Sequence, residues 1–221
     1  IRKYLKGKKL RFGEYWQSSL SVGKAPIEWI VLGVSSRGGI LLLSDKALAC
    51  KPYNTTLDDV TWETCSLRKW LNGTFLDDAF NAEEQALIQR TTVSADRNPE
   101  YDTNPGNDTT DKVFLLSITE AEECFDNDKA RKCAPTAYAM AQVADTIDDY
   151  ADESDDYTIA DESDDYETED GSPDAWWLRS PGNYQFDAAN VFGDGSVYSS
   201  GFSVHCDFVC VRPALWIKLE S

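Results

Sequence analysis

Trp176-Trp177-Leu178-Arg179-Ser180-Pro181-Gly182 and Val211-Arg212-Pro213-Ala214-Leu215-Trp216-Ile217 enclose a segment of different composition near the end of the chain. This segment, residues 183–210, consists of Asn, Tyr, Phe, Asp, Ser, His and Cys, separated by small residues and single valines. Large side chains suited to contact therefore lie between two stiff, aromatic-rich brackets. The composition predicts a recognition surface and is less suited to catalysis.

The segment between the brackets has a β pattern. Residues 188–192 and 196–199 flank Gly193-Asp194-Gly195, which predicts a hairpin. Ser200-Gly201 predicts the next turn, followed by strands over 202–207 and 209–217. Because side chains alternate along a strand, single valines are expected to point inward and their neighbours outward. The expected inward anchors are Val191, Val197, Val204 and Val211.

Working outward, the N-terminal part also predicts β structure. Strands are expected near residues 12–15, over 27–34 and over 40–44, with a turn at 35–39 and the last strand buried on both faces. Lys112 to Ser117 predicts another strand.

Helices are expected between these strands and near the middle of the chain. Thr61 or Thr64 is the expected cap of a helix over 66–72 that ends at Asn72-Gly73. Asn81 and Glu84 have the spacing of a capping box. Residues 91–110 predict a loop, and Thr119 is expected to cap a helix through Phe125, with another over 138–143. We therefore predict a single α+β domain over residues 1–221, with antiparallel sheets, two or more short helices and long loops.

The charge excludes one class of partner. The net charge is −18, which argues against nucleic acid because phosphates would be repelled. Fourteen Asp and Glu lie in residues 145–170 without any Lys or Arg, so the rest of the chain sums to about −4. No stretch reaches the roughly 20 apolar residues of a membrane span. We also find no secretion signal.

The start of the chain leaves localisation open. The chain begins at Ile1, which predicts an upstream segment, and its basic start over residues 2–9 fits a solvated tail better than a linker or anchor. Cell-surface and phage-associated locations both remain possible, and the oligomeric state is not predicted.

The cysteines indicate mostly free thiols. Six cysteines permit fifteen disulfide pairings, none lies in a Cys-x-x-Cys motif, and a single His leaves no zinc set. We expect no metal and no cofactor.

The acidic block repeats Ala-Asp-Glu-Ser-Asp-Asp-Tyr at residues 151–157 and 160–166. It is interpreted as a flexible insertion over 145–171. A calcium site is the alternative, although the spacing is not that of an EF-hand loop.

The motifs resemble one bacterial family. Residues 26–32, 50–54, 61–72 and 111–117, together with both brackets, are similar in order and content to the DUF6273 domain, which is common in gut Firmicutes. The resemblance covers nearly the whole chain except the acidic block. It implies a C-type-lectin-like fold, in the branch that includes formylglycine-generating enzymes.

The resemblance also implies a function. Some members look like variable proteins of diversity-generating retroelements, in which adenine-directed mutagenesis rewrites AAC codons near the end of the gene. The products include Phe, Tyr, Ser, Cys, His, Asp, Gly, Val and Asn, but not Lys, Glu, Met, Trp or Gln. Residues 183–210, the expected variable region, follow this rule except at Gln185. The chain is thus expected to be a receptor-type binder of protein or glycan targets.

Seventeen positions form the expected ligand-binding surface. They are Asn183, Tyr184, Phe186, Asp187, Asn190, Phe192, Gly193, Ser196, Tyr198, Ser199, Ser200, Phe202, Ser203, His205, Cys206, Asp207 and Phe208.

Other interpretations remain open. At least one Phe of the segment is expected in the core. Trp176 and Trp177 are interpreted as either sugar-stacking or core residues, with Arg179 paired to an internal carboxylate. A non-diversified structural or assembly domain is one alternative function. An oxidase resembling formylglycine-generating enzymes, using Cys206 and Cys210, is another, although a catalytic thiol needs a base or an electropositive setting. No catalytic residue is assigned.

Overall fold

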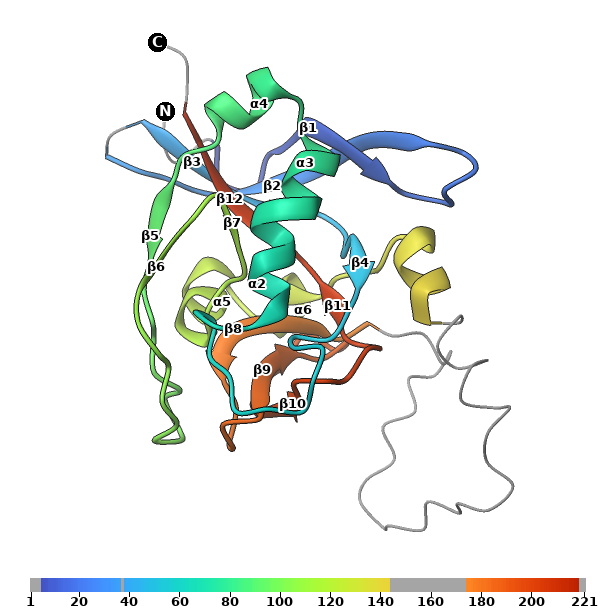
Figure 1. Cartoon of the computed structure of the whole chain (residues 1–221). Helices are drawn as coiled ribbons and strands as arrows, with labels where there is room; N and C mark the ends of the chain where they lie inside the picture. The colour runs from blue at the N-terminus through green and yellow to red at the C-terminus, as the bar shows by residue number, and fades with distance from the viewer. Residues whose placement is uncertain (1–4, 37, 144–173, 219–221) are drawn as a thin grey trace, which may run out of the picture.

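The computed structural model describes residues 5–36, 38–143 and 174–218, and these ranges contain two five-stranded sheets (Figure 1). The first sheet has the order β1-β2-β3-β12-β7, with every neighbouring pair antiparallel. Its strands are β1 (Lys9–Trp16), β2 (Lys24–Val34), β3 (Gly39–Ser44), β12 (Ala214–Lys218) and β7 (Val113–Phe114). The expected N-terminal hairpin is confirmed, and β3 is buried on both faces except at Leu41.

The second sheet has the order β10-β9-β8-β11-β4 and contains the segment between the brackets. Its strands are β10 (Val197–Ser203), β9 (Asp187–Val191), β8 (Trp176–Pro181), β11 (Cys210–Val211) and β4 (Ala49–Cys50). Only the β8–β11 pair is parallel. Every residue of β8 is buried. The opening bracket therefore forms the middle of this sheet.

The closing bracket connects the two sheets. Val211 ends β11 in the second sheet, and Ala214 begins β12 in the first sheet. Arg212 and Pro213 are the buried link between them. The expected single strand over 209–217 is wrong for this reason, since the chain changes sheets in its middle.

Short helices lie beside the sheets, and α2, η1 and α3 form one column in Figure 1. The helices are α2 (Ser66–Trp70), the π-helix η1 (Leu71–Phe75), α3 (Leu76–Ala79), α4 (Ala82–Leu87), α5 (Ile118–Cys124), α6 (Asp128–Arg131) and residues 137–143. The fold class is thus confirmed as α+β with mostly antiparallel sheets. No helix among the described residues is long and apolar enough to cross a membrane.

Two expected helix starts are wrong, and one is confirmed. Cys65, not Thr61 or Thr64, caps α2, because its sulfur accepts a hydrogen bond from the Arg68 amide. Ser117, not Thr119, caps α5 in a capping box with Glu120. The expected capping box of Asn81 and Glu84 is present at α4.

The helix that begins with α2 does not end at Asn72-Gly73. It continues through η1 into α3, and the Asn72 side chain holds the wide turn in place. Its amide nitrogen donates to the Arg68 and Val113 carbonyls, and its amide oxygen accepts from the Lys112 and Val113 amides. These tertiary hydrogen bonds override the helix-ending tendency of Asn-Gly.

Two further expectations need correction. The expected loop over 91–110 begins and ends in a short ladder of β5 (Thr91–Val93) with β6 (Thr109–Asp111).

Ser200-Gly201 is not a turn, since β10 runs through it with a register shift between Tyr198 and Phe202. Gly201 has φ 77°, and a Cβ there would lie 2.3 Å from the Ala188 carbonyl oxygen. Both features fit a β-bulge at a position that requires glycine. The predicted acidic insertion lies outside the described residues.

Candidate ligand-binding surface

The expected ligand-binding positions lie on β9, on the edge strand β10 and on the segments beside them. Exposure divides these positions into three groups. Five are exposed: Asn183, Tyr184, Phe186, His205 and Phe208. Ten are half-buried: Asp187, Phe192, Gly193, Ser196, Tyr198, Ser200, Phe202, Ser203, Cys206 and Asp207.

Asn190 and Ser199 form the third group and do not belong to an exposed surface. Asn190 is 0% exposed and lies in β9 between Trp177 of β8 and Tyr198 of β10. Ser199 is 9% exposed, and its carbonyl accepts a hydrogen bond from Asn98. The residue type alone did not predict the burial of these two positions. Asn190 lies in β9, which is buried on both faces from Ala188 to Val191, whereas Ser199 lies in the edge strand β10 and is covered beside Asn98.

Two aromatic groups characterise the surface. The rings of Tyr184 and Phe186 stack with centroids 5.3 Å apart and planes 8° apart, and both side chains are exposed. Farther along the hairpin, Phe192 stacks on Tyr198, while Phe202 contacts both of them and Phe208. Phe192 and Phe202 also pack against the core. The expectation that at least one Phe of the segment packs into the core is confirmed in this partly buried form.

Gln185 is the one residue of 183–210 that adenine-directed mutagenesis cannot produce from an AAC codon, and it has a structural role. Its amide nitrogen donates to the carbonyls of Val60 (2.9 Å) and Asn104 (3.0 Å), and its amide oxygen accepts from the Asn104 amide. The Gln185 carbonyl also accepts from the Val60 amide. The side chain therefore joins two loops, over 54–64 and 95–108, to the first turn of the segment.

The valines between the variable positions are largely buried. Val191, Val204 and Val211 are at most 1% exposed, as expected, whereas Val197 is only half-buried. The Val204 amide donates to the Phe186 carbonyl, and the Val204 carbonyl accepts from the Asn54 amide. Val204 thus fixes the backbone beside the exposed aromatic pair.

The loop over 95–108 supports the surface in a way that the sequence did not predict. The Asn98 amide nitrogen donates to the Pro181 and Ser199 carbonyls, and Thr103 donates to the Gly182 carbonyl. Tyr101 and Ser200 share a hydrogen bond through their hydroxyl groups, 2.7 Å apart. The short polar side chains of this loop were the available signal, since Asn and Thr commonly bond to backbone groups.

The opening bracket is part of the core. Trp176 and Trp177 are both 0% exposed, so the sugar-stacking interpretation of this pair is wrong. Arg179 forms ion pairs with Glu120 and Asp96, which confirms the expected internal carboxylate partner. Its carbonyl also accepts from the Tyr53 hydroxyl at 3.0 Å. These contacts attach β8 to helix α5, to the loop over 95–108 and to Tyr53.

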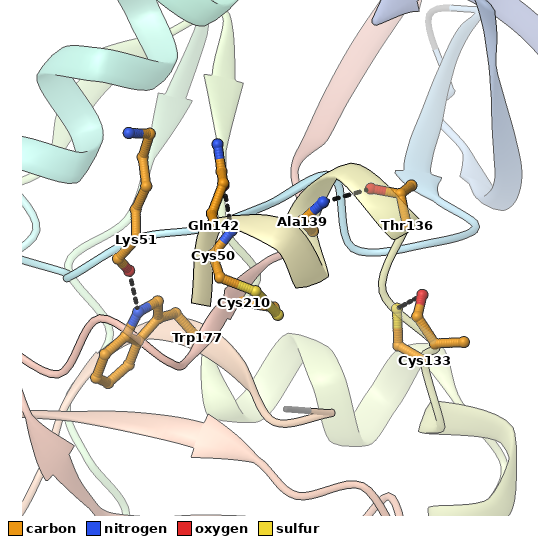
Figure 2. The surroundings of a disulfide bond; sticks show 9 residues. Cys50, Lys51, Cys133, Thr136, Ala139, Gln142, Trp177 and Cys210 are labelled. Carbon is orange, nitrogen blue, oxygen red and sulfur yellow. Dashed lines mark hydrogen bonds between the residues drawn. A yellow bond between two sulfur atoms is a disulfide. The ribbon is translucent and has the colours of Figure 1, made fainter. Parts of the chain in front are cut away.

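The second sheet contains a disulfide between Cys50 of β4 and Cys210 of β11 (Figure 2). The two residues face each other in the antiparallel pair, and the Gln142 side chain accepts from the Cys50 amide at 2.9 Å. On the other side of Cys50, the Trp177 indole donates to the Lys51 carbonyl. The remaining cysteines, Cys65, Cys124, Cys133 and Cys206, are free thiols. Four of six are thus unpaired, in line with the expectation.

This pairing bears on the oxidase alternative, since Cys210 is bonded to Cys50 and not to Cys206. Burial, together with the neighbouring carboxylates of Asp207 and Asp187, raises the pKa of the Cys206 thiol to about 11. His205 points its Nδ1 at the Ser203 hydroxyl, 2.8 Å away. Within the described ranges, no group of three or more His, Cys, Asp or Glu is arranged to hold a metal ion.

Comparison with known proteins gives one match. The family model described as "Domain of unknown function (DUF6273)" matches residues 37–219, which include both sheets' central strands and the whole candidate surface. No curated protein and no solved structure matches the chain significantly. The matched range covers most of the sequence, and the chain therefore belongs to the DUF6273 family.

Proposed function

We propose that this chain is a receptor-type variable protein of a diversity-generating retroelement, which binds protein or glycan targets through residues 183–210. Within the DUF6273 family we also propose a C-type-lectin-like fold. Antiparallel sheets, short helices and long loops are compatible with that assignment, as is the placement of the first and last strands in one sheet.

One observation carries the proposal: the residue types that adenine mutagenesis can produce lie mostly at the surface, whereas the one type that it cannot produce is held by hydrogen bonds. The seventeen expected ligand-binding positions all hold residues that adenine mutagenesis can produce, and fifteen of them are exposed or half-buried. Gln185, which that mutagenesis cannot produce from AAC, is fixed by hydrogen bonds to two loops. This difference supports the proposal that residues at the surface vary whereas Gln185, which holds two loops, stays fixed.

The surface also has the composition of a binding site. Tyr and Phe offer large contact area with only two torsions to order, while Ser, Asn and Gly adapt their hydrogen bonds to the target. Tyr184 is 58% exposed and Phe186 39% exposed although both are large apolar rings. Aromatic residues are enriched at the centres of protein interfaces, which supports a binding role for this pair.

The exposed positions can be substituted without loss of the contacts that hold the fold beneath them. Arg179 and its carboxylates, the Cys50–Cys210 disulfide and the Asn98 hydrogen bonds lie below or beside the aromatic groups. None of these contacts uses the side chain of Tyr184, Phe186 or Phe208. Changes at the exposed positions therefore leave the fold's main tertiary contacts in place.

The deciding test is genomic. We expect a near-copy of the codons for residues 183–210 close to the gene, differing only where the template has adenine, together with a reverse transcriptase gene. Genes from related isolates should differ at Tyr184, Phe186 and Phe208 but not at Gln185 or Gly201. If no template copy lies near the gene, or if substitutions are spread evenly over the segment, the variable-protein proposal fails.

A further inference from the structure

Acidic side chains surround the exposed aromatic pair of Tyr184 and Phe186. Four segments meet there: residues 54–64, 95–108, 183–187 and 203–208. Hydrogen bonds join them, from Asn54 to Val204, from Val204 to Phe186, from Val60 to Gln185 and between Gln185 and Asn104. They therefore form one continuous face.

This face is strongly acidic. The four segments hold three, four, one and one Asp or Glu, which makes nine, against a single Arg, Arg97. Arg97 is itself paired with Asp102 at 2.7 Å. Asp96 also forms an ion pair, with Arg179, which lies outside the four segments. Outside residues 145–170 the sequence sums to about −4, whereas the four segments alone sum to −8, so the acidic charge of that part of the sequence is concentrated in them.

Acidic and aromatic groups are close together on this face. Asp58 and Asp59 are exposed in the loop that is fixed at Asn54 and Val60 beside the aromatic pair. Asp187 directly follows Phe186, and its carboxylate accepts a hydrogen bond from the Tyr184 amide. The exposed rings of Tyr184 and Phe186 attract cations over their faces, and Arg in particular stacks on such rings.

We infer that the natural partner of this face is a cationic polypeptide segment, whose Arg or Lys side chains stack on Tyr184 and Phe186 and pair with the surrounding carboxylates. This inference rests on the proposed binding function and specifies its partner. Complementary charge increases the association rate and excludes acidic partners. A neutral glycan would use the rings but would gain nothing from the carboxylates' charge.

The test uses the full chain and three dye-labelled probes: an (Arg-Gly-Ser)4 peptide, an (Glu-Gly-Ser)4 peptide and a chitotetraose oligosaccharide. Fluorescence anisotropy is measured at low salt and again at about 0.3 M NaCl, where charges are screened beyond a few ångströms. We expect binding of the Arg peptide only, weakened about tenfold or more by the added salt.

Variants separate a site from general attraction to an acidic protein. Tyr184→Ala with Phe186→Ala should weaken Arg-peptide binding about tenfold, and Asp58→Asn with Asp59→Asn should weaken it and reduce its salt dependence. Two control pairs remove equal charge elsewhere: Glu122→Gln with Glu123→Gln on α5, and Asp155→Asn with Asp156→Asn in the acidic block. Both control pairs should bind as the wild type does.

The inference is overturned if the control pairs weaken binding as much as the site pairs do, or if the Arg peptide does not bind. Chitotetraose or Glu-peptide binding that is lost in Tyr184→Ala would overturn it too, yet would leave the proposed binding function intact. The genomic test decides that function independently.

Discussion

The guanidinium of Arg212 lies over the indole ring of Trp176, 5.0 Å from its centroid, and so joins the two brackets that enclose the candidate surface. Arg212 is 1% exposed and donates to the carbonyls of Ser44 and Arg131 at 3.0 Å. It sits where the chain passes from the second sheet to the first. One side chain thus ties both sheets and helix α6 together.

This contact predicts that Arg212→Lys is strongly destabilising. A lysine keeps the charge but lacks the planar fork that reaches two carbonyls while stacking on an indole. We expect the free energy of unfolding to fall by about 2–4 kcal/mol, measured by urea denaturation. The exposed Arg11→Lys on β1 is the control and should change stability by less than about 0.5 kcal/mol. Equal stability of the two variants would show that the buried fork is not needed.

Substitutions of the neighbouring residues Gln185 and Tyr184 are predicted to have different effects, one on stability and the other on ligand binding. Gln185→Ala removes three hydrogen bonds, to the Val60 and Asn104 carbonyls and from the Asn104 amide. Because Asn104 is exposed and Val60 half-buried, water can replace part of this bonding, so the free energy of unfolding should fall by about 1–2 kcal/mol. Tyr184→Ala removes an exposed ring and should cost less than about 0.5 kcal/mol while it reduces ligand binding. Thermal denaturation of both variants checks the division. The reverse order of stability would contradict the assignment of Gln185 to the frame.

Asn190 is predicted to contribute no stability. Neither atom of its buried amide has a hydrogen-bond partner among the described residues. Replacing an unsatisfied amide with an apolar side chain of similar shape removes a desolvation cost, so Asn190→Leu should leave stability unchanged or raise it by about 1 kcal/mol.

Asn98→Leu is the matched control for Asn190→Leu, because the Asn98 amide is also buried but donates to two carbonyls. It should lower stability by about 1–3 kcal/mol. Chemical denaturation of the two variants side by side measures the difference. A large loss in Asn190→Leu would mean that its amide does bond in solution.

The Cys50–Cys210 disulfide is predicted to stabilise the second sheet. It joins residues 160 positions apart, and closing so long a loop lowers the entropy of the unfolded chain. Cys50→Ser with Cys210→Ser should lower the free energy of unfolding by about 2–5 kcal/mol. Peptide mapping without reductant should recover the Cys50–Cys210 peptide pair, and the denatured, unreduced protein should titrate four thiols. Six titrating thiols would contradict the pairing.

Alkylation of Cys206 is predicted to be slow and pH-dependent. Burial raises the pKa of its thiol to about 11, so the reactive thiolate forms only well above neutral pH. The alkylation rate should rise about tenfold per pH unit between pH 8 and 10, since the thiolate fraction does so below the pKa. Cys65, which is fully buried and has its pKa raised to about 12, should react only after unfolding. Mass spectrometry of iodoacetamide-treated protein checks both rates, and a Cys206 rate that is flat with pH would contradict the raised pKa.

Local features of the fold were predictable from the sequence. The Gly193-Asp194-Gly195 hairpin, the N-terminal strands and the Asn81 capping box depend on residues within a few positions of each other. The helix starts at Cys65 and Ser117 were missed by one to four residues, because several hydroxyl side chains compete as caps and the packed helix selects one.

The hairpin that holds the candidate surface was predictable, but the exposure of its individual positions was not. The alternation of valines with polar and aromatic residues located a hairpin with an outer face. Whether a given small polar residue lies on that face depends on what covers the strand, and Asn190 and Ser199 are covered. The supporting loop over 95–108 was also missed, since its hydrogen bonds reach residues about 80 positions away.

The sequence by itself determined the two brackets, the set of residue types in the segment between them, and the departure of Gln185 from that set. These are properties of residue type and order. Only the tertiary structure decided that the closing bracket changes sheets at Arg212-Pro213, that Cys210 pairs with Cys50, and that Gln185 holds two distant loops. These contacts join residues far apart in the chain. Their selection depends on the packing of both sheets at once, which no local pattern encodes.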